Sequence, residues 1–369
     1  MDEPFRALYL HLPFCKRRCR YCDFTTREAQ PGSPEVAAYM ERLIGEARQA
    51  ARTGTLRGIE TVYLGGGTPS HLGSARLSGL LYALSVSLEG YAGMEVTLEA
   101  NPESISLPLV KDIWALGVNR ISIGVQSFND KMLSFLGRVH SAEDARRAIC
   151  LAQERFDNVS IDLMCGIPGQ SFEDFQESLE AALALGIRHV SVYPLVIEEG
   201  TPLAAAADHG EFTEPDQDFQ ALMMQMAQSI LEPAGLSRYE VASYAAPGFE
   251  CRHNTAYWTG LPYLGLGDSA VTMTQDARRR TRLQDGRVVE QLDRRQMQAE
   301  DLMMAMRMTR GIGSSSLAEA ALLLPEAPQV FHGLVKDGLL ERAEGRLRPT
   351  LAGWLCGNEL YGRILELAP

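Results

Sequence analysis

Hydrophobic runs alternate with helical periodicities over the first half of the chain. Six runs rich in Val, Ile, Leu and Tyr predict strands, at Ala7–Leu12, Thr61–Leu64, Glu95–Ala100, Arg120–Val125, Ser160–Met164 and His189–Pro194. Several of these runs are almost continuously apolar, which is typical of parallel strands that are buried on both faces. The pattern therefore predicts a parallel sheet.

Readable helix ends separate the predicted strands. Pro34 follows Ser33 as a first helical residue, and the apolar positions Val36, Met40, Leu43 and Ala47 then recur on one face. Other helix starts are predicted at Ser106, Ser141 and Ser171, and helix ends at Gly117 and Gly186. Repeated strand–helix units with right-handed crossovers predict an α/β fold, a partial (β/α)6 TIM-like barrel. Its active site is expected at the carboxyl ends of the strands.

The pattern changes after Gly200. A Met-rich helix is predicted over Pro215–Leu231, with methionines that fill the core, and a hairpin over Arg279–Gln291 around Asp285-Gly286. The end of the chain is mainly helical, with a short strand pair near Leu340 and Leu347, and resembles a winged helix. We therefore predict three regions: a barrel over 1–200, an α+β extension over 201–298 and a helical region over 299–369.

Composition and charge narrow the class of protein. Of the 369 residues, 46% are hydrophobic and 22% are charged, which indicates a folded globular protein. The net charge of −12 disfavours a nucleic-acid partner, and the basic stretch Arg278–Arg282 is interpreted as a solvated strand face. The polar start Met1–Arg6 is not a signal peptide, and no apolar run reaches the length of a membrane span. We expect a cytoplasmic protein with reduced thiols.

Three cysteines follow the first predicted strand closely. Cys15, Cys19 and Cys22 form a CxxxCxxC pattern. Three thiolates on a tight loop can hold three irons of a [4Fe–4S] cluster and leave the fourth iron open. A structural zinc site needs four ligands, and no second Cys/His pair follows at suitable spacing. The other four cysteines are scattered and are interpreted as ordinary buried thiols.

Longer motifs carry a resemblance that covers most of the chain. They read YLHLPFCKRRCRYCDF from Tyr9, GGGTPS from Gly65, LEANPE from Leu98, GVNRISIGVQSF from Gly117, LGRVH from Leu136 and IDLMCGIPGQ from Ile161. Such a chain resembles the radical-SAM proteins related to oxygen-independent coproporphyrinogen III dehydrogenase. With CRHNTAYWTG from Cys251 and YLGLGDSA from Tyr263, it is most similar to their branch of HemW-type heme chaperones.

The resemblance implies a site for S-adenosylmethionine (SAM) beside the cluster. In these proteins the open iron binds SAM, and an electron from the cluster breaks a carbon–sulfur bond to give a 5′-deoxyadenosyl radical. The residues implied to line the SAM pocket are Tyr9, Tyr21, Gly66, Gly67, Thr68, Glu99, Gln126, Arg138 and Asp162. Read without the resemblance, the glycines also fit a tight turn, the polar residues also fit caps, and Tyr21 also fits packing under the loop.

His253 is the candidate ligand for heme. It lies in the sequence HNTAYW with Tyr257 and Trp258, and the resemblance to the heme chaperones implies a heme-binding role. The alternative is a histidine that is hydrogen-bonded within an ordered loop. His11, before Leu12-Pro13-Phe14, is interpreted as a support for the cysteine loop.

One position departs from the dehydrogenase pattern. That enzyme has a fourth cysteine two residues after the third, whereas this chain has Phe24. The sequence therefore favours a heme chaperone that binds the cluster, SAM and heme and transfers heme to an acceptor hemoprotein, including a membrane-associated one. Oxidative decarboxylation of coproporphyrinogen III is the alternative, and a radical-SAM enzyme acting on RNA or protein is a third. Whether the protein is an enzyme, and whether it is a monomer or a cluster-dependent dimer, both stay open.

Overall fold

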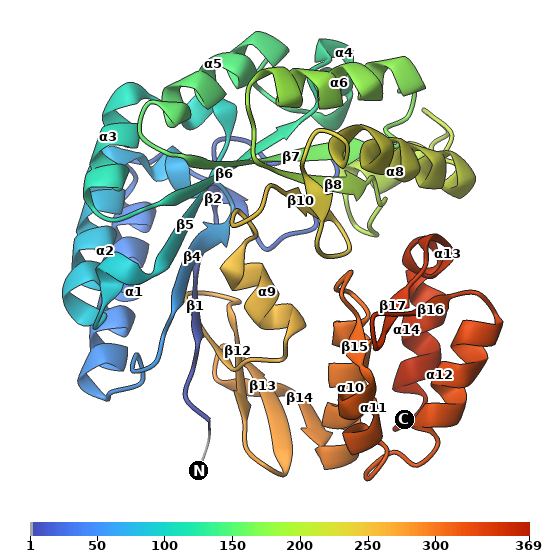
Figure 1. Cartoon of the computed structure of the whole chain (residues 1–369). Helices are drawn as coiled ribbons and strands as arrows, with labels where there is room; N and C mark the ends of the chain where they lie inside the picture. Colours follow the sequence, from blue (N-terminus) through green and yellow to red (C-terminus); the bar gives the residue numbers. More distant parts are fainter. Residues whose placement is uncertain (1–2) are drawn as a thin grey trace.

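A curved sheet of twelve strands forms the body of the protein in the computed structural model, which describes residues 3–369 (Figure 1). Its centre is a run of six parallel strands in the order β1-β4-β5-β6-β7-β8. The bounds of these strands are β1 Ala7–Leu12, β4 Thr61–Gly66, β5 Glu95–Ala100, β6 Arg120–Gln126, β7 Asn158–Cys165 and β8 His189–Pro194. The predicted partial barrel is confirmed, and each predicted strand matches within two residues at either end.

Helices cover the outer, convex face of this sheet (Figure 1). Their bounds are α1 Pro34–Arg52, α2 Gly73–Ser87, α3 Leu107–Ala115, α4 Asp130–Leu136, α5 Ala142–Gln153 and α6 Phe172–Ala184. Ser33, Ser106, Ser141 and Ser171 are N-caps, as predicted, and each side chain accepts a hydrogen bond from a backbone N–H of the first turn. Their apolar faces and the strands form the main hydrophobic core.

Short strands extend the sheet at both edges. Beyond β1 lie β11 Tyr263–Leu266, β12 Val271–Gln275, β13 Arg279–Gln284 and β14 Arg287–Asp293; beyond β8 lie β10 Ser243–Ala245 and β9 Ser237–Arg238. The predicted hairpin around Asp285 is β13–β14. β11 pairs in parallel with β1, a neighbour that the sequence did not predict. Residues 201–298 thus continue the sheet of the barrel.

The remaining helices of this extension lie inside and beside the sheet. They are α7 Pro202–Asp208, the Met-rich α8 Gln217–Leu231 and α9 Arg252–Trp258. Met223 and Met224 of α8 are buried in the core, as predicted. α9 lies within the concave side of the curved sheet (Figure 1) and contacts β4.

The C-terminal region has a hydrophobic core of its own. It consists of α10 Arg294–Ala305, β15 Ile312–Gly313, α11 Ser314–Ala320, α12 Ala327–Lys336, β16 Leu340–Ala343, β17 Arg346–Pro349, α13 Leu351–Leu355 and α14 Gly357–Leu365. The indole N–H of Trp354 donates to the carbonyl of Val241 at 2.8 Å, and Arg238 lies over the same ring. These contacts attach the region to the extension. The predicted division into three regions stays a prediction.

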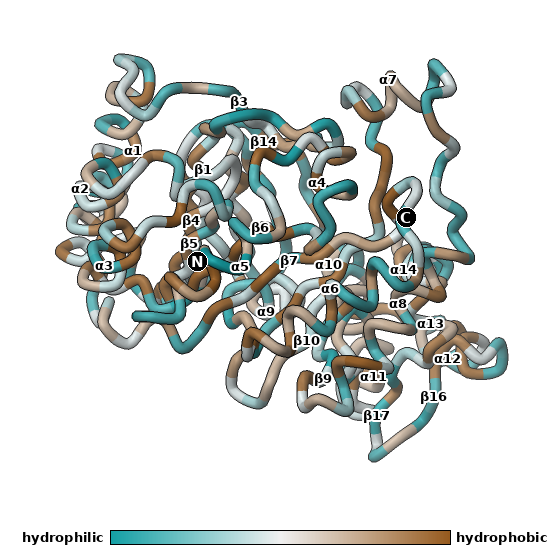
Figure 2. Tube along the Cα trace, turned by 90° about the horizontal axis from the view of Figure 1, so that it is seen from above, coloured by the Kyte–Doolittle hydropathy of each residue, from teal (hydrophilic) through white to brown (hydrophobic). Residues whose placement is uncertain are grey.

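The connection after β1 leaves the barrel as a polar loop. It contains β2 Phe14–Cys15 and β3 Arg27–Glu28, and the tube at β3 is hydrophilic in Figure 2. We call residues 13–28 the cysteine loop. Within residues 3–369, no helix combines the length and the apolar character needed to cross a membrane.

Candidate functional site

The cysteine loop is held against the barrel by polar contacts. Cys15 pairs with Glu28 across the short parallel strands β2 and β3. The backbone N–H of Arg20 donates to the last carbonyl of α4 at 3.1 Å. Nε2 of His11 lies 2.9 Å from the carbonyl oxygen of Thr25, so the ring donates there, in line with its predicted role as a support for the loop.

A cavity of about 140 Å³ lies between this loop and the carboxyl ends of the barrel strands. Cys15, Cys19 and Cys22 line it together. It is also lined by every residue of the predicted SAM pocket except Tyr9, namely Tyr21, Gly66, Gly67, Thr68, Glu99, Gln126, Arg138 and Asp162. We call it the polar cavity. The structure thus brings these residues to one place, because parallel strands end at the same edge of a sheet; SAM binding by them stays a prediction.

Two of the glycines that line the cavity, Gly66 and Gly67, permit a close approach of the end of β4 to the cysteine loop. A Cβ on Gly67 would lie 2.8 Å from the backbone nitrogen and oxygen of Phe14. Gly66 has φ +113°, and a Cβ there would lie 2.6 Å from the ring of His11. No side chain fits at either position, so the glycines are needed for the fold of the site as well as for access to it.

Gln126 has a strained backbone at the end of β6. Its φ of 66° is rare for a residue other than glycine, and the β6–β7 register shifts between Gly124 and Gln126. Such a bulge re-aims a side chain at the end of a strand. Backbone strain of about 1–3 kcal/mol persists where the surrounding structure imposes it, commonly at functional sites.

Two carboxyl groups lie inside the polar cavity. Burial and the nearby charge of Asp162 raise the pKa of Glu99 to about 7, against the hydrogen bonds that it accepts from Tyr63 Oη (2.8 Å) and the Gly66 N–H (3.1 Å). Burial also raises the pKa of Asp162 to about 6. Both groups can therefore gain or lose a proton near neutral pH.

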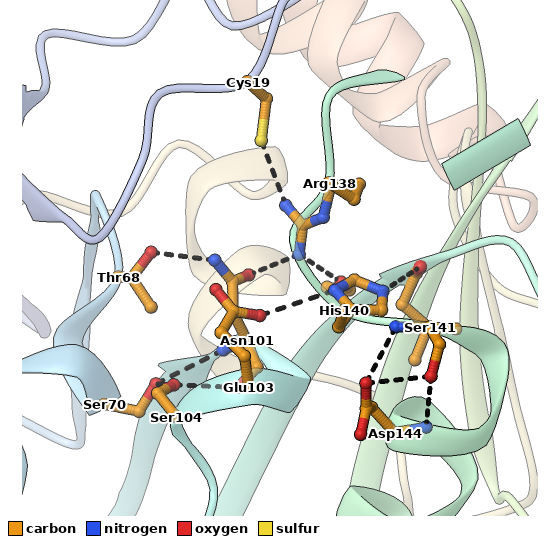
Figure 3. A network of polar contacts seen from close by, with 12 residues as sticks. Cys19, Thr68, Ser70, Asn101, Glu103, Ser104, Arg138, His140, Ser141 and Asp144 are labelled. Carbon is orange, nitrogen blue, oxygen red and sulfur yellow. Dashed lines mark hydrogen bonds and ion pairs between the residues drawn. The ribbon is translucent and has the colours of Figure 1, made fainter. Parts of the chain in front are cut away.

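Two of the cysteine sulfurs receive hydrogen bonds from the cavity wall. Thr68 Oγ1 donates to Cys15 Sγ at 3.6 Å. Arg138 Nη1 donates to Cys19 Sγ at 3.4 Å (Figure 3). Burial raises the pKa of Cys15 to about 11, so this thiol needs a strong positive partner to ionise. An iron centre supplies such a charge.

The three cysteines suit a cluster better than a single ion. In residues 3–369, no group of three His, Cys, Asp or Glu side chains converges closely enough to hold one metal ion. In a cubane cluster each thiolate binds its own iron, so the sulfurs stand further apart than the ligands of one ion. Three thiols around one cavity, with donors to two of them, fit that arrangement.

A second, larger cavity adjoins the polar one. It measures about 530 Å³ and is mostly apolar, with a wall formed by Tyr9, Phe24, Tyr257, Trp258, Tyr263 and Met304. We call it the apolar cavity. Phe24, Gly66 and Glu99 line both cavities and so form their common boundary. Tyr9, predicted for the SAM pocket, lies here instead, with its hydroxyl 3.1 Å from Nδ1 of His11.

His253 lies on α9 beneath these cavities and is 1% exposed. Its Nδ1 is 2.9 Å from Thr61 Oγ1, its Nε2 is 3.0 Å from Tyr257 Oη, and its ring stacks on Tyr63. Burial, with the charge of Arg120, lowers its pKa to about 3. Neither ring nitrogen is free for a heme iron, so this geometry favours the alternative of a hydrogen-bonded histidine, within a helix rather than a loop.

A buried carboxylate fixes α9. Glu95 of β5 is 7% exposed and accepts hydrogen bonds from the backbone N–H groups of Arg252 (3.0 Å) and His253 (2.9 Å). These donors belong to the first turn of the helix, which has no partner for them within the helix. Glu95 thereby sets the position of Tyr257 and Trp258 one turn further on.

Two of the sequence interpretations need correction. Cys150 and Cys356 are exposed, so only Cys165 and Cys251 are the buried thiols expected. Arg280 is not on a solvated strand face: it is 1% exposed and pairs with Glu300 and Asp301. Because these acidic partners neutralise it, the basic stretch offers little to RNA.

The sequence missed Asn101 and Arg282. Asn101 lines the polar cavity, and Arg282 lines the apolar one. Asn101 follows a predicted strand within LEANPE, so its place at a strand end was a usable signal. Arg282 had no such signal, because its hairpin joins the barrel only through β12 and β11, and β11 pairs with β1 far away in the sequence.

The fold and the cysteine-lined cavity are those of a radical SAM protein. Residues 9–182 match the family model described as the Radical SAM superfamily, and membership of that superfamily implies a [4Fe–4S] cluster and SAM. The chain belongs to the HemW family of heme chaperones. It is 36% identical to "Heme chaperone HemW" of Mycobacterium tuberculosis, over 98% of this chain and 95% of that protein.

Other relatives agree with this assignment. "Heme chaperone HemW" of Bacillus subtilis is 31% identical, over 98% of this chain and 99% of that one. The solved structure of coproporphyrinogen III oxidase (HemN) from Escherichia coli, a radical SAM enzyme, has a TM-score of 0.79 and covers 99% of this chain and 90% of that chain. Its sequence is 22% identical, so the likeness establishes the fold and not the reaction.

Proposed function

We propose that this protein holds a [4Fe–4S] cluster and SAM in the polar cavity, binds heme in the apolar cavity and transfers that heme to an acceptor hemoprotein. One observation carries the proposal: the two cavities share a wall, made by Phe24, Gly66 and Glu99. A cluster site and an aromatic-lined pocket are thereby adjacent in one chain.

In the polar cavity, Cys15, Cys19 and Cys22 would hold the cluster. When bound, the cluster supplies one electron at a time and an open iron that binds SAM. Around it, Arg138 and Thr68 donate to the cysteine sulfurs. Glu99, Gln126 and Asp162 line the cavity and would form hydrogen bonds with the polar groups of SAM. Tyr21 of the cysteine loop lines the same cavity.

The apolar cavity suits a flat, largely apolar ligand. Its volume of about 530 Å³ lies within the ordinary range of small-molecule and cofactor sites, about 300–1,000 Å³. Aromatic side chains offer broad contact area with little loss of conformational entropy. Arg282 lines the same cavity, where its guanidinium pairs with Glu290 and Glu300, so a heme propionate would bind it by displacing one of these carboxylates.

The acceptor, the compartment and the oligomeric state remain parts of the proposal. HemW relatives are named heme chaperones, and we extend that role to this chain, with cytoplasmic heme delivery to a hemoprotein, including one at a membrane. Phe24 stands where the dehydrogenase pattern has a fourth cysteine, so coproporphyrinogen III decarboxylation is treated as an outcome of the test.

The test is a heme titration after anaerobic reconstitution of the cluster. We expect about one heme per chain, no coproporphyrinogen consumed in a parallel assay, and transfer of heme to an apo-hemoprotein. Val271→Trp, which fills the apolar cavity, should abolish heme binding. Val288→Trp, on the exposed strand β14, should leave it unchanged. Porphyrinogen turnover without heme binding would refute the chaperone proposal.

The variant His253→Ala tests whether His253 is a ligand of the heme iron or a structural support of the cavity. If His253 supports the cavity, added imidazole should not restore the heme absorption spectrum of this variant, since the lost contacts are to Thr61 and Tyr257. Restoration of the wild-type spectrum by imidazole would instead identify His253 as an iron ligand.

A further inference from the structure

Asn101 stands between the two groups that donate to the cysteine sulfurs (Figure 3). It follows β5 directly and lines the polar cavity. We infer that Asn101 is a positioning residue, which fixes the hydrogen bonds received by Cys15 and Cys19 and thereby sets the reduction potential of the cluster. The inference rests on the proposed function, because it concerns a cluster held by these cysteines.

The first step is the orientation of the Asn101 amide. Arg138 Nη2 lies 2.7 Å from Asn101 Oδ1. A guanidinium has donors and no acceptor, so the atom that faces it must be the amide oxygen. The amide nitrogen, Nδ2, is then directed to Thr68 Oγ1 at 2.9 Å.

The second step is the direction of the Thr68 hydroxyl. Its oxygen accepts from Asn101 Nδ2, and a hydroxyl carries a single hydrogen. That hydrogen is therefore left for Cys15 Sγ, 3.6 Å away. Thr68 is 3% exposed, so water does not compete for it. Without Asn101, the hydroxyl could rotate to donate elsewhere.

The third step is the guanidinium of Arg138. Its Nη2 donates to Asn101 Oδ1 and to the carbonyl of Gly124 at 2.6 Å, which occupies both of its hydrogens. Nη1 is thereby turned toward Cys19 Sγ at 3.4 Å. A Cβ on Gly124 would lie 3.1 Å from Asn101 Oδ1, a tight contact that would push against the amide.

Asn101 is itself fixed by its backbone. Its N–H donates to Ser70 Oγ at 3.2 Å, and Ser104 Oγ donates to its carbonyl at 2.8 Å. Both the backbone and the side chain of Asn101 are therefore held by hydrogen bonds. A single amide is bonded to both donors, Thr68 after β4 and Arg138 after α4.

Hydrogen bonds to cluster sulfurs raise the reduction potential, because they stabilise the extra negative charge of the reduced state. Loss of the fixed donors should therefore shift the potential to more negative values. A tenfold change in the reduction equilibrium corresponds to about 59 mV for one electron, and we expect Asn101→Ala to reach about that shift.

The test is the midpoint potential of the reconstituted cluster, measured without SAM by an anaerobic redox titration followed by electron paramagnetic resonance. Asn101→Ala and Thr68→Val should both shift it negative, while Thr68→Ser keeps the wild-type value. The double variant Asn101→Ala with Thr68→Val should shift less than the sum of the two, because one acts through the other. Asn358→Ala, an exposed asparagine on α14, is the matched control and should keep the wild-type potential.

Each outcome of these measurements supports or overturns the role inferred for Asn101. Unchanged potentials in Asn101→Ala and Thr68→Val, or additive shifts in the double variant, would overturn the inference while the cluster proposal stands. If Asn101→Ala does not retain the cluster, Asn101→Asp replaces it in the test, because the aspartate keeps an acceptor for Arg138. Adding Thr68→Val to Asn101→Asp should then cause no further shift in the midpoint potential. A further shift would overturn the inference. A wild-type chain that takes up no cluster would instead refute the proposed function.

Discussion

The two cavities of this protein differ in origin as well as in character. The polar cavity is lined by residues from Cys15 to Asp162, which lie on the cysteine loop and the ends of barrel strands. The apolar cavity draws much of its wall from α9, β11–β13 and α10, all after residue 251. One cavity belongs to the barrel, and the other exists only because the extension folds back onto β1.

The polar cavity is therefore a site lined by charged groups, and the apolar cavity is one lined by aromatic groups. Buried donors and carboxyl groups in the polar cavity suit a ligand with charges to match, because unpaired buried charges are costly. Aromatic and methionine side chains in the apolar cavity suit a ligand whose apolar surface is removed from water when it binds. Phe24, Gly66 and Glu99 are where the two chemistries meet. The predictions below test whether the cavities act separately.

The largest expected effect is loss of the cluster in Cys19→Ser. A serine oxygen is a poor replacement for a thiolate on iron, so almost all of the reconstituted iron should be lost. Iron and sulfide analysis after anaerobic reconstitution measures this, with the exposed Cys150→Ser as the control. Heme titration should stay near one per chain. Loss of heme binding together with the cluster would show that the two cavities form one site.

The next largest effect is expected for Glu95→Ala, which should destabilise α9 and with it the wall of the apolar cavity. It leaves the buried N–H groups of Arg252 and His253 without their acceptor. We expect a loss of about 3 kcal/mol or more in the free energy of unfolding, since a buried charged acceptor is removed. Denaturant unfolding measures it, and Glu60→Ala, in an exposed ion pair with Arg6, should change stability by less than about 1 kcal/mol. Equal losses in both variants would contradict this role for Glu95.

The free energy of unfolding should decrease as pH rises, because of Glu99 in the wall that the two cavities share. The pKa of Glu99 is near 4.5 in the unfolded chain and about 7 when folded, so the folded state holds this proton more tightly. The stabilisation is complete below pH 4.5 and is lost as pH rises through 7, by about 3 kcal/mol. Glu99→Gln should lose less stability over this range in denaturant unfolding. An identical pH profile in the variant would assign the change to other groups, such as Asp162.

The smallest effect on stability is expected for Phe24→Ala. The side chain is 65% exposed, so the free energy of unfolding should change by less than about 0.5 kcal/mol. It still contacts the apolar cavity, and loss of about 1 kcal/mol of ligand contact would weaken heme binding about fivefold. Transfer of heme to excess apo-globin measures the change. Val86→Ala, on the exposed face of α2, is the control, and an equal effect there would make Phe24 unimportant.

The barrel was predictable because its signals are local. A continuous apolar run predicts a buried strand without knowledge of its partner, and serines such as Ser141 and Ser171 mark helix starts by bonding within one turn. Polar residues at strand ends, such as Glu99 and Gln126, follow from the same logic, since the ends of parallel strands share an edge.

The apolar cavity was not predictable for the opposite reason. β11 has four residues, and its place beside β1 depends on pairing across most of the chain. α9 has seven residues with no repeated apolar face, and its start is capped by Glu95 from a distant strand rather than by a neighbouring side chain. Tyr9 was placed in the SAM pocket by resemblance alone, whereas its strand neighbours direct it to the other cavity.

The pairing of β1 with β11 also has a consequence for synthesis of the chain on the ribosome. β1 leaves the ribosome before the barrel helices, yet its neighbour β11 emerges only after those helices are made. Until then one side of β1 presents unpaired backbone groups, which can pair with other chains. The cysteine loop follows β1 directly, so uptake of the cluster during synthesis would occur on a barrel that is still open at that edge. Nascent chains stalled before Tyr263 should therefore be the species most prone to aggregation.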